Sequence, residues 1–205
     1  MALSRRMVIL SAAATLSGCV GVGTFRTFYA APISANLSRN WHVAKVSVTV
    51  PRTLSVSEEH TYEPKSDIVW REDPKGDRYA QVQTIMENAI SRGASGLHGP
   101  RAVTIAVNMS RFHAMTFEAE SISMDVGVHN IDFTAQVFDA RTGEALTPPE
   151  FIDAAFPAMS GAAMAQARAA GQSQKSQITA HVAATIAGWL GTGPDPRMTF
   201  VRAGN

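Results

Sequence analysis

The 205-residue sequence predicts an α+β fold: a two-layer domain in which a small, mainly antiparallel sheet packs on two helices, in the order β-α-β-β-α. Three segments alternate apolar and polar residues, as half-buried strands do, and two segments repeat apolar residues at helical spacing. With 45% hydrophobic and 17% charged residues, the chain has enough apolar surface to form one core.

The first strand and the first helix are separated by a long loop. Valines alternate with polar residues over residues 46–50, ahead of a proline that closes the strand. Residues 57–78 carry many charges and no periodicity, which predicts an ordered loop with a short extended piece at residues 68–70. Asp77 can cap a helix whose apolar stripe covers residues 82–90 and which a glycine ends.

The second and third strands are expected to pair antiparallel. Residues 103–109 and 131–137 both alternate, with their apolar side chains at odd-numbered positions. Residues 122–128 also alternate, but there the apolar side chains are at even-numbered positions. Because a one-residue slip sends side chains to the opposite face of a sheet, we expect a bulge or turn within residues 127–130.

The C-terminal part predicts a second long helix. Residues 145–160 contain three prolines and are expected to be irregular, and the alanine-rich residues 161–170 are expected to form a short helix. Apolar residues then recur at helical spacing over residues 178–190, before glycines and a proline end the helix. Both long helices therefore offer one apolar stripe to a single sheet face.

The N-terminus has the layout of a secretory signal peptide. Arg5 and Arg6 precede an apolar run of 12 residues, Met7 to Gly18. As a helix, this run would span about 18 Å, less than the roughly 30 Å hydrocarbon core of a bilayer. A permanent transmembrane helix is therefore not expected, and the arginine pair leaves both general secretory and twin-arginine export open.

The run ends in Leu16-Ser17-Gly18-Cys19, which resembles the lipobox of bacterial lipoproteins. The resemblance implies cleavage after Gly18 and a lipid on Cys19, which would anchor the protein to a membrane. Cys19 is the one cysteine of the chain and cannot form an internal disulfide; the alternative is that it is an ordinary small or core residue. Val20 follows in place of the aspartate that retains lipoproteins in the inner membrane, so the resemblance favours the outer membrane.

These observations divide the chain into three parts. Residues 1–18 are the predicted signal peptide, and residues 19–42, rich in small and polar residues, are a predicted tether. Residues 43–205 are expected to form a single periplasmic domain. Without Arg5 and Arg6 the chain has 16 Lys and Arg (18 − 2) against 17 Asp and Glu, a net charge of −1, which argues against a nucleic-acid partner.

Six segments of the predicted domain are Tyr62-Glu63-Pro64, Asp67-Ile68-Val69-Trp70-Arg71, Asp77-Arg78-Tyr79, Arg111-Phe112-His113-Ala114, Gly127-Val128-His129 and Gly171-Gln172-Ser173-Gln174-Lys175. Together they resemble a domain-of-unknown-function family of alphaproteobacterial lipoproteins, over nearly all of the mature chain. That family brings no known activity. The element order also resembles, more weakly, the auxiliary lipoproteins of ABC-type envelope transporters, a likeness of layout that does not establish function.

The chemical motifs of common hydrolases are missing from the sequence. It contains no G-x-S-x-G, H-E-x-x-H or S-x-x-K motif, so we expect neither catalytic residues nor a cofactor. His113 and His129 could approach each other across the predicted hairpin and, with the acidic residues between them, bind a divalent metal. The alternative is that each histidine forms local hydrogen bonds at a strand end.

The long loop and the hairpin connection are candidate interaction surfaces, because they mix aromatic and charged side chains. In the alternative, Trp70 anchors the loop on the sheet edge and the apolar connection folds back on the core. The candidate interaction residues are Tyr62, Trp70, Arg71, Asp77, Arg78, Phe112 and Phe117.

Together these features predict a non-catalytic lipoprotein, anchored to the outer membrane through Cys19, that binds a protein partner in an envelope transport or assembly system. The alternatives are a carrier for a lipid or small ligand, and a metal-dependent hydrolase that uses His113 and His129.

Overall fold

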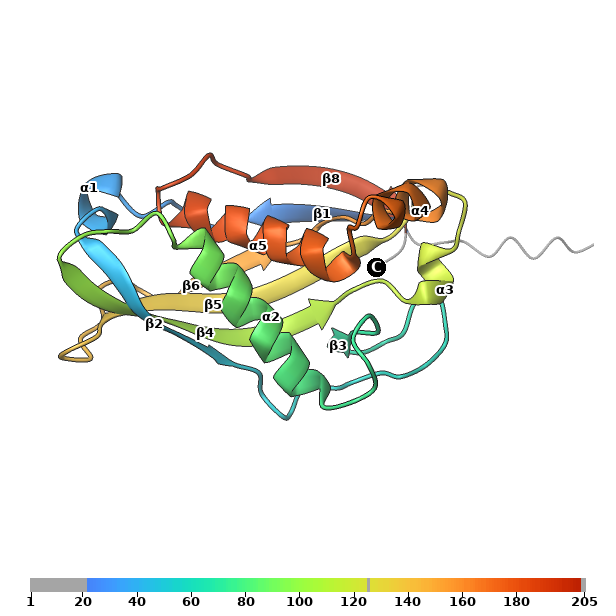
Figure 1. Cartoon of the computed structure of the whole chain (residues 1–205), viewed down its shortest axis with the longest axis horizontal. Helices are drawn as coiled ribbons and strands as arrows, with labels where there is room; N and C mark the ends of the chain where they lie inside the picture. The colour runs from blue at the N-terminus through green and yellow to red at the C-terminus, as the bar shows by residue number, and fades with distance from the viewer. Residues whose placement is uncertain (1–21, 125, 204–205) are drawn as a thin grey trace, which may run out of the picture.

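The computed structural model describes residues 22–124 and 126–203, in which an eight-stranded, mostly antiparallel sheet is covered on one face by helices (Figure 1). Neighbouring strands follow the order β2-β4-β5-β6-β1-β8, with β3 paired to β4 and β7 paired to β5. Two pairs are parallel, β2 with β4 and β3 with β4. The elements are β1 (Val22–Phe28), α1 (Ala35–Ser38), β2 (Trp41–Thr49), β3 (Ile68–Val69), α2 (Arg78–Gly93), β4 (Arg101–His113), α3 (Phe117–Glu120), β5 (Val128–Asp139), β6 (Glu150–Ala154), β7 (Phe156–Pro157), α4 (Gly161–Ala169), α5 (Gln174–Trp189) and β8 (Met198–Ala203).

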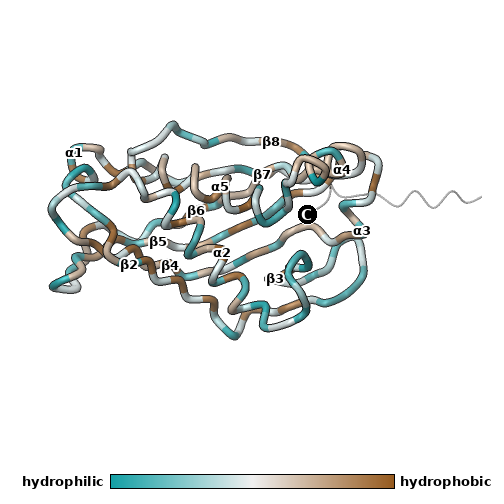
Figure 2. Tube along the Cα trace, in the orientation of Figure 1, coloured by the Kyte–Doolittle hydropathy of each residue, from teal (hydrophilic) through white to brown (hydrophobic). Residues whose placement is uncertain are grey.

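The core lies between α2, α5 and the central strands. The odd-numbered residues of β4 from Val103 to Met109 and of β5 from Ile131 to Val137 are buried against the apolar stripes of the two helices, as the periodicity predicts. Figure 2 shows apolar residues recurring along these strands beneath the helices. The antiparallel pairing of β4 with β5 is also confirmed.

The local signals around the first helix are confirmed. The Asp77 carboxylate accepts hydrogen bonds from the backbone N–H groups of Tyr79 (3.0 Å) and Ala80 (3.2 Å), so it caps α2. The short extended piece is β3, and the alanine-rich segment is α4. Among the described residues, no helix is long and apolar enough to cross a membrane.

The sheet is larger than predicted, and the segment predicted as a tether is part of it. Residues 22–28 form β1, which pairs with β8 over six residue pairs and with β6 over two, and α1 follows. Residues 19–21 lie outside the described residues. The sheet is therefore not a small one on two helices: the described part of the chain has eight strands and five helices.

Two other segments also differ from the prediction. Residues 150–157, expected to be irregular, form β6 and β7, which pair with β5. Residues 122–124, expected to begin a strand, follow α3 without joining the sheet. The predicted break is confirmed: Gly127 has a φ of +89°, which favours glycine, and β5 begins at the next residue.

Candidate functional site

The sheet has one face against the helices and one face that is half-exposed. On β5, the even-numbered residues from Asn130 to Gln136 alternate with the buried ones and are half-exposed. A bulge between Met109 and Arg111 of β4 puts Arg111 opposite Asp132, so that both side chains lie on the half-exposed face of the sheet. We call this side the open face, defined by Arg26, Arg111, Asn130, Asp132, Thr134, Gln136 and Asp153.

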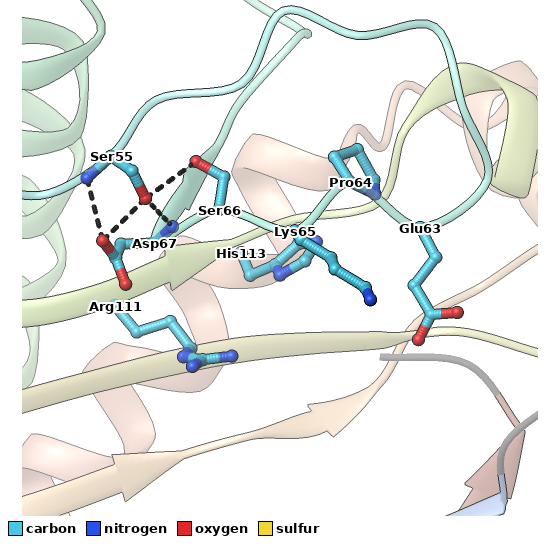
Figure 3. A pocket seen from close by; sticks show the side chains of 8 residues that line it. All are labelled: Ser55, Glu63, Pro64, Lys65, Ser66, Asp67, Arg111 and His113. Carbon is cyan, nitrogen blue, oxygen red and sulfur yellow. Dashed lines mark hydrogen bonds between the residues drawn. The ribbon is translucent and has the colours of Figure 1, made fainter.

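A pocket of about 480 Å³ lies at one end of the open face, where the loop before β3 passes the end of β4 (Figure 3). One wall is fixed by hydrogen bonds. The Asp67 carboxylate accepts from the backbone N–H and the hydroxyl of Ser55, at 2.8 and 2.7 Å, and the Ser55 hydroxyl accepts from the Asp67 N–H at 3.0 Å. The bond from the Ser55 backbone is the main reason why the pKa of Asp67 is lowered. The lining residues are Ser55, Glu63, Pro64, Lys65, Ser66, Asp67, Arg111 and His113.

His113 lines this pocket and is 4% exposed. Its ring makes no hydrogen bond to another described residue. Burial, and then the charge of Arg111, lowers the pKa of His113 to about 4, so the imidazole is neutral near pH 7. A neutral imidazole offers one N–H donor and one acceptor nitrogen. The pocket therefore holds a side chain able to donate or accept a hydrogen bond.

A row of four charged side chains crosses the open face next to the pocket. Asp132 and Asp153 are cross-strand neighbours on β5 and β6. The Arg111 Nε lies 3.8 Å from Asp132 Oδ2, and the Arg26 Nε lies 3.4 Å from Asp153 Oδ2. Burial and then the neighbouring Asp153 raise the pKa of Asp132 to about 6. Like charges directly opposite each other destabilise a sheet, so this row is a costly feature of the fold.

Replacing Asp132 by asparagine is expected to raise the free energy of unfolding at pH 7 by about 2 kcal/mol, because a pKa shift of one unit corresponds to about 1.4 kcal/mol. The folded pKa is above the unfolded value, so the folded wild-type protein binds more protons and loses stability as pH rises from about 4 to 6. The Asp132→Asn protein should lack this loss. Urea unfolding at several pH values checks this; an equal difference between the two proteins at pH 4 and pH 7 would contradict it.

Most of the predicted interaction residues are in the interior, which corrects the sequence-based expectation. Trp70 and Phe112 are fully buried and pack edge to face, with ring centroids 5.7 Å apart. The Arg71 and Arg78 guanidinium groups are also buried, and both pair with the Glu58 carboxylate. Arg71 Nη1 lies 3.7 Å from Glu58 Oε2, and Arg78 Nε lies 2.7 Å from Glu58 Oε1. Loops need such anchors to be ordered, and buried side chains cannot contact a partner without rearrangement.

The remaining interaction candidates have different roles. Asp77 is a helix cap that also binds Arg52. Tyr62 and Phe117 are exposed, by 65% and 48%. Gly18 and Cys19 lie outside the described residues.

The two candidate metal-binding histidines lie on opposite faces of the sheet. The register pairs His113 with Asn130, so His129 is displaced by one residue and faces the helices. There His129 is 1% exposed and packs against Phe156, with the two ring centroids 4.9 Å apart. Both ring nitrogens of His129 lack hydrogen-bond partners. Burial lowers the pKa of His129 to about 3. Within residues 22–124 and 126–203, no group of three or more His, Cys, Asp or Glu side chains could hold a metal ion.

The pocket residues Ser55, Lys65 and Asp67 were not identified from the sequence as a site. They lie in a loop without periodicity, and the two-residue pairing of β3 with β4 brings them to Arg111. The one sequence signal is the apolar pair at Ile68 and Val69, which marks where the loop returns to the sheet.

The fold and the site define an α+β domain with helices on one sheet face and a polar pocket on the other. The chain belongs to DUF6778, a family of unknown function, whose model matches residues 41–205. The matched part thus begins at β2 and leaves out β1 and α1. No curated protein matches the sequence.

Solved structures with similar chains are remote. The PelC dodecamer from Paraburkholderia phytofirmans is 12% identical, with a TM-score of 0.35 over 82% of this chain and 96% of that chain. A point variant of the same PelC dodecamer is 13% identical, with the same TM-score over 82% of this chain and 95% of that chain. A Caulobacter crescentus chain described as a "putative lipoprotein" is 9% identical, with a TM-score of 0.30 over 73% of this chain and 93% of that chain.

Proposed function

We propose that this protein is a lipoprotein anchored to the periplasmic side of the outer membrane through Cys19, and that it binds an envelope protein with its open face. In this proposal it is a non-catalytic accessory module of a transport or assembly system. The lipobox at residues 16–19 supports the anchor. The binding role is supported chiefly by one observation, the pocket of the open face in which the side chains of Asp67, Arg111 and the nearly buried His113 lie together.

The chemistry of the pocket favours a polar protein segment as its occupant. The Asp67 carboxylate is an acceptor fixed in place, the Arg111 guanidinium is a forked donor, and neutral His113 can donate or accept. A lipid carrier would need an apolar cavity, whereas this pocket is lined by charged and hydroxyl side chains. A backbone segment or polar side chains of a partner would form hydrogen bonds with the His113 ring, which makes none to another described residue.

Photo-crosslinking in intact cells tests the binding role. The crosslinking residue replaces Lys65, which is exposed at the pocket, and for comparison Leu37, which is 43% exposed on α1. We expect one dominant envelope protein to be captured at Lys65 and not at Leu37. Arg111→Gln should reduce that capture about tenfold, the effect of losing about 1.4 kcal/mol at a central contact. Equal products at both positions, or none at Lys65, would contradict the proposal.

The anchor is tested separately by cell fractionation. Cys19→Ser removes the thiol that would carry the lipid, so the variant should move from the membrane fraction to the soluble fraction. The wild-type protein should incorporate a labelled fatty acid and the variant should not. A wild-type protein without label would refute the anchor and leave the crosslinking result to be judged alone.

A further inference from the structure

The start of β1 lies at the same end of the molecule as α3 and α4, while α1 lies at the opposite end (Figure 1). Val22 pairs with Ala203, and Ala203 forms a bridge with Val126 on its other side. The Gly127 N–H also donates to the Ala203 carbonyl at 2.8 Å. The first described residue is therefore joined through one strand to the segment that follows α3.

This end of the molecule exposes large apolar side chains, which we call the apolar tip: Phe117, Met124 and Met159. They are 48%, 61% and 41% exposed. The Ser160 hydroxyl donates to the Met124 carbonyl at 2.6 Å, which ties the segment before α4 to the segment after α3. The three side chains thus belong to segments held together at one end of the domain.

The acidic side chains of α3 all have partners. Glu118 accepts a hydrogen bond from His60 Nδ1 at 2.8 Å. Glu120 accepts two from the Arg168 guanidinium, both at 2.8 Å. Pairing reduces the cost of moving a carboxylate out of bulk water, so these charges oppose contact with a lipid surface less than free ones would.

The length of chain between the anchor and the sheet limits where this end can be. Val22 is the third residue after Cys19, and three residues span at most about 11 Å. The headgroup region on each side of a bilayer is itself about 5–8 Å deep. A lipid on Cys19 therefore holds the start of β1, and the apolar tip near it, at the membrane surface.

We propose that the apolar tip rests in the headgroup region of the membrane that holds the lipid anchor, with phospholipid as its occupant. This inference rests on the anchor proposed above. Exposed aromatic and methionine side chains are stabilised when they are buried at the boundary of headgroups and acyl chains. The anchor and the tip together orient the domain, with α1 directed away from the membrane and the open face at the side, accessible to a partner.

Fluorescent labels on the full-length lipidated protein test this orientation. A lipid on Cys19 consumes the one native thiol, so a cysteine introduced at Phe117, Met124 or Leu37 is the one free thiol of each variant. Leu37 is the matched control, with 43% exposure against 48% for Phe117. The labelled proteins are reconstituted in phosphatidylethanolamine and phosphatidylglycerol vesicles that contain a lipid-borne quencher. We expect loss of fluorescence for the Phe117→Cys and Met124→Cys proteins and none for Leu37→Cys.

The outcomes separate this proposal from the anchor. If the proteins float with the vesicles but all three labels keep their fluorescence, the protein is anchored and the apolar tip does not contact lipid. If the proteins do not float, and unmodified protein reacts with the label at Cys19, the anchor itself is wrong and this proposal is wrong with it.

Discussion

Replacing Trp70 by alanine is expected to lower the free energy of unfolding by about 3–5 kcal/mol, the usual cost of deleting a buried tryptophan. The side chain is fully buried, it packs edge to face on Phe112, and its Nε1–H donates to Asp73 at 2.9 Å. The alanine would leave a cavity beneath the loop and an Asp73 oxygen without its donor. Because a domain is stable by only about 5–15 kcal/mol, this loss is a large fraction of the total, and the variant should unfold at a clearly lower urea concentration than the wild-type protein. Urea denaturation followed by circular dichroism measures the change.

Tyr62→Ala is the matched control for Trp70→Ala, because Tyr62 is an aromatic residue of the same loop that is 65% exposed. Its replacement should change the free energy of unfolding by less than about 0.5 kcal/mol. If Trp70→Ala proved as mild as Tyr62→Ala, Trp70 would not anchor the loop, and its role as an interaction residue would have to be considered again.

The parts of the fold that the sequence predicts correctly are those whose signals are local. Helix α2 combines a capping aspartate, an apolar stripe and a terminal glycine within one stretch of chain. Strands β4 and β5 are central, and buried and more exposed residues alternate along β4 from Val103 to Met109 and along β5 from Ile131 onward. Neighbouring residues alone therefore identify these elements.

The missed strands are defined by partners far along the chain. Strand β1 is half-exposed and carries Phe25 and Phe28 three residues apart, which is not the period of a strand. It is ordered by β8, more than 170 residues later, where Phe25 stacks on Phe200 with ring centroids 5.8 Å apart. No local pattern contains this pairing. For the same reason the sequence predicts a tether over residues 19–42, whereas residues 22–28 of this segment form β1.

The candidate site, like the missed strands, depends on contacts between residues that are far apart in the sequence. Composition correctly marks residues 57–78 as rich in aromatic and charged residues, but composition does not give the direction of a side chain. The Arg71 and Arg78 side chains are buried and pair with the carboxylate of Glu58, whereas Lys65, without a carboxylate partner among the described residues, remains exposed at the pocket. The sequence could place His113 at a strand end, and the bulge that puts Arg111 beside the pocket could not be predicted from it.

Replacing Glu72 by alanine is expected to lower the free energy of unfolding by about 2–3 kcal/mol, because one carboxylate serves three donors. It accepts hydrogen bonds from the backbone N–H groups of Gln174 (3.0 Å) and Lys175 (2.6 Å), at the start of α5. The Arg168 Nη1 lies 3.0 Å from the same carboxylate, which is 13% exposed. The alanine leaves these backbone donors without their acceptor and removes negative charge from the positive end of a helix.

Two variants show whether the carboxylate or its surroundings matters. Glu72→Gln keeps one oxygen that can accept from an α5 N–H but has no charge for Arg168, so about half of the loss should remain. Glu144→Ala, which removes a 72% exposed carboxylate 4.0 Å from Arg101, should cost less than about 1 kcal/mol. Because Glu72 is largely shielded from solvent, its effect should persist at about 1 M salt, whereas that of Glu144 should vanish. A Glu72→Ala loss that disappears at high salt would mean that Glu72 acts as a surface charge, and that the ion pair between Asp73 and Lys175 of α5 holds the loop to that helix instead.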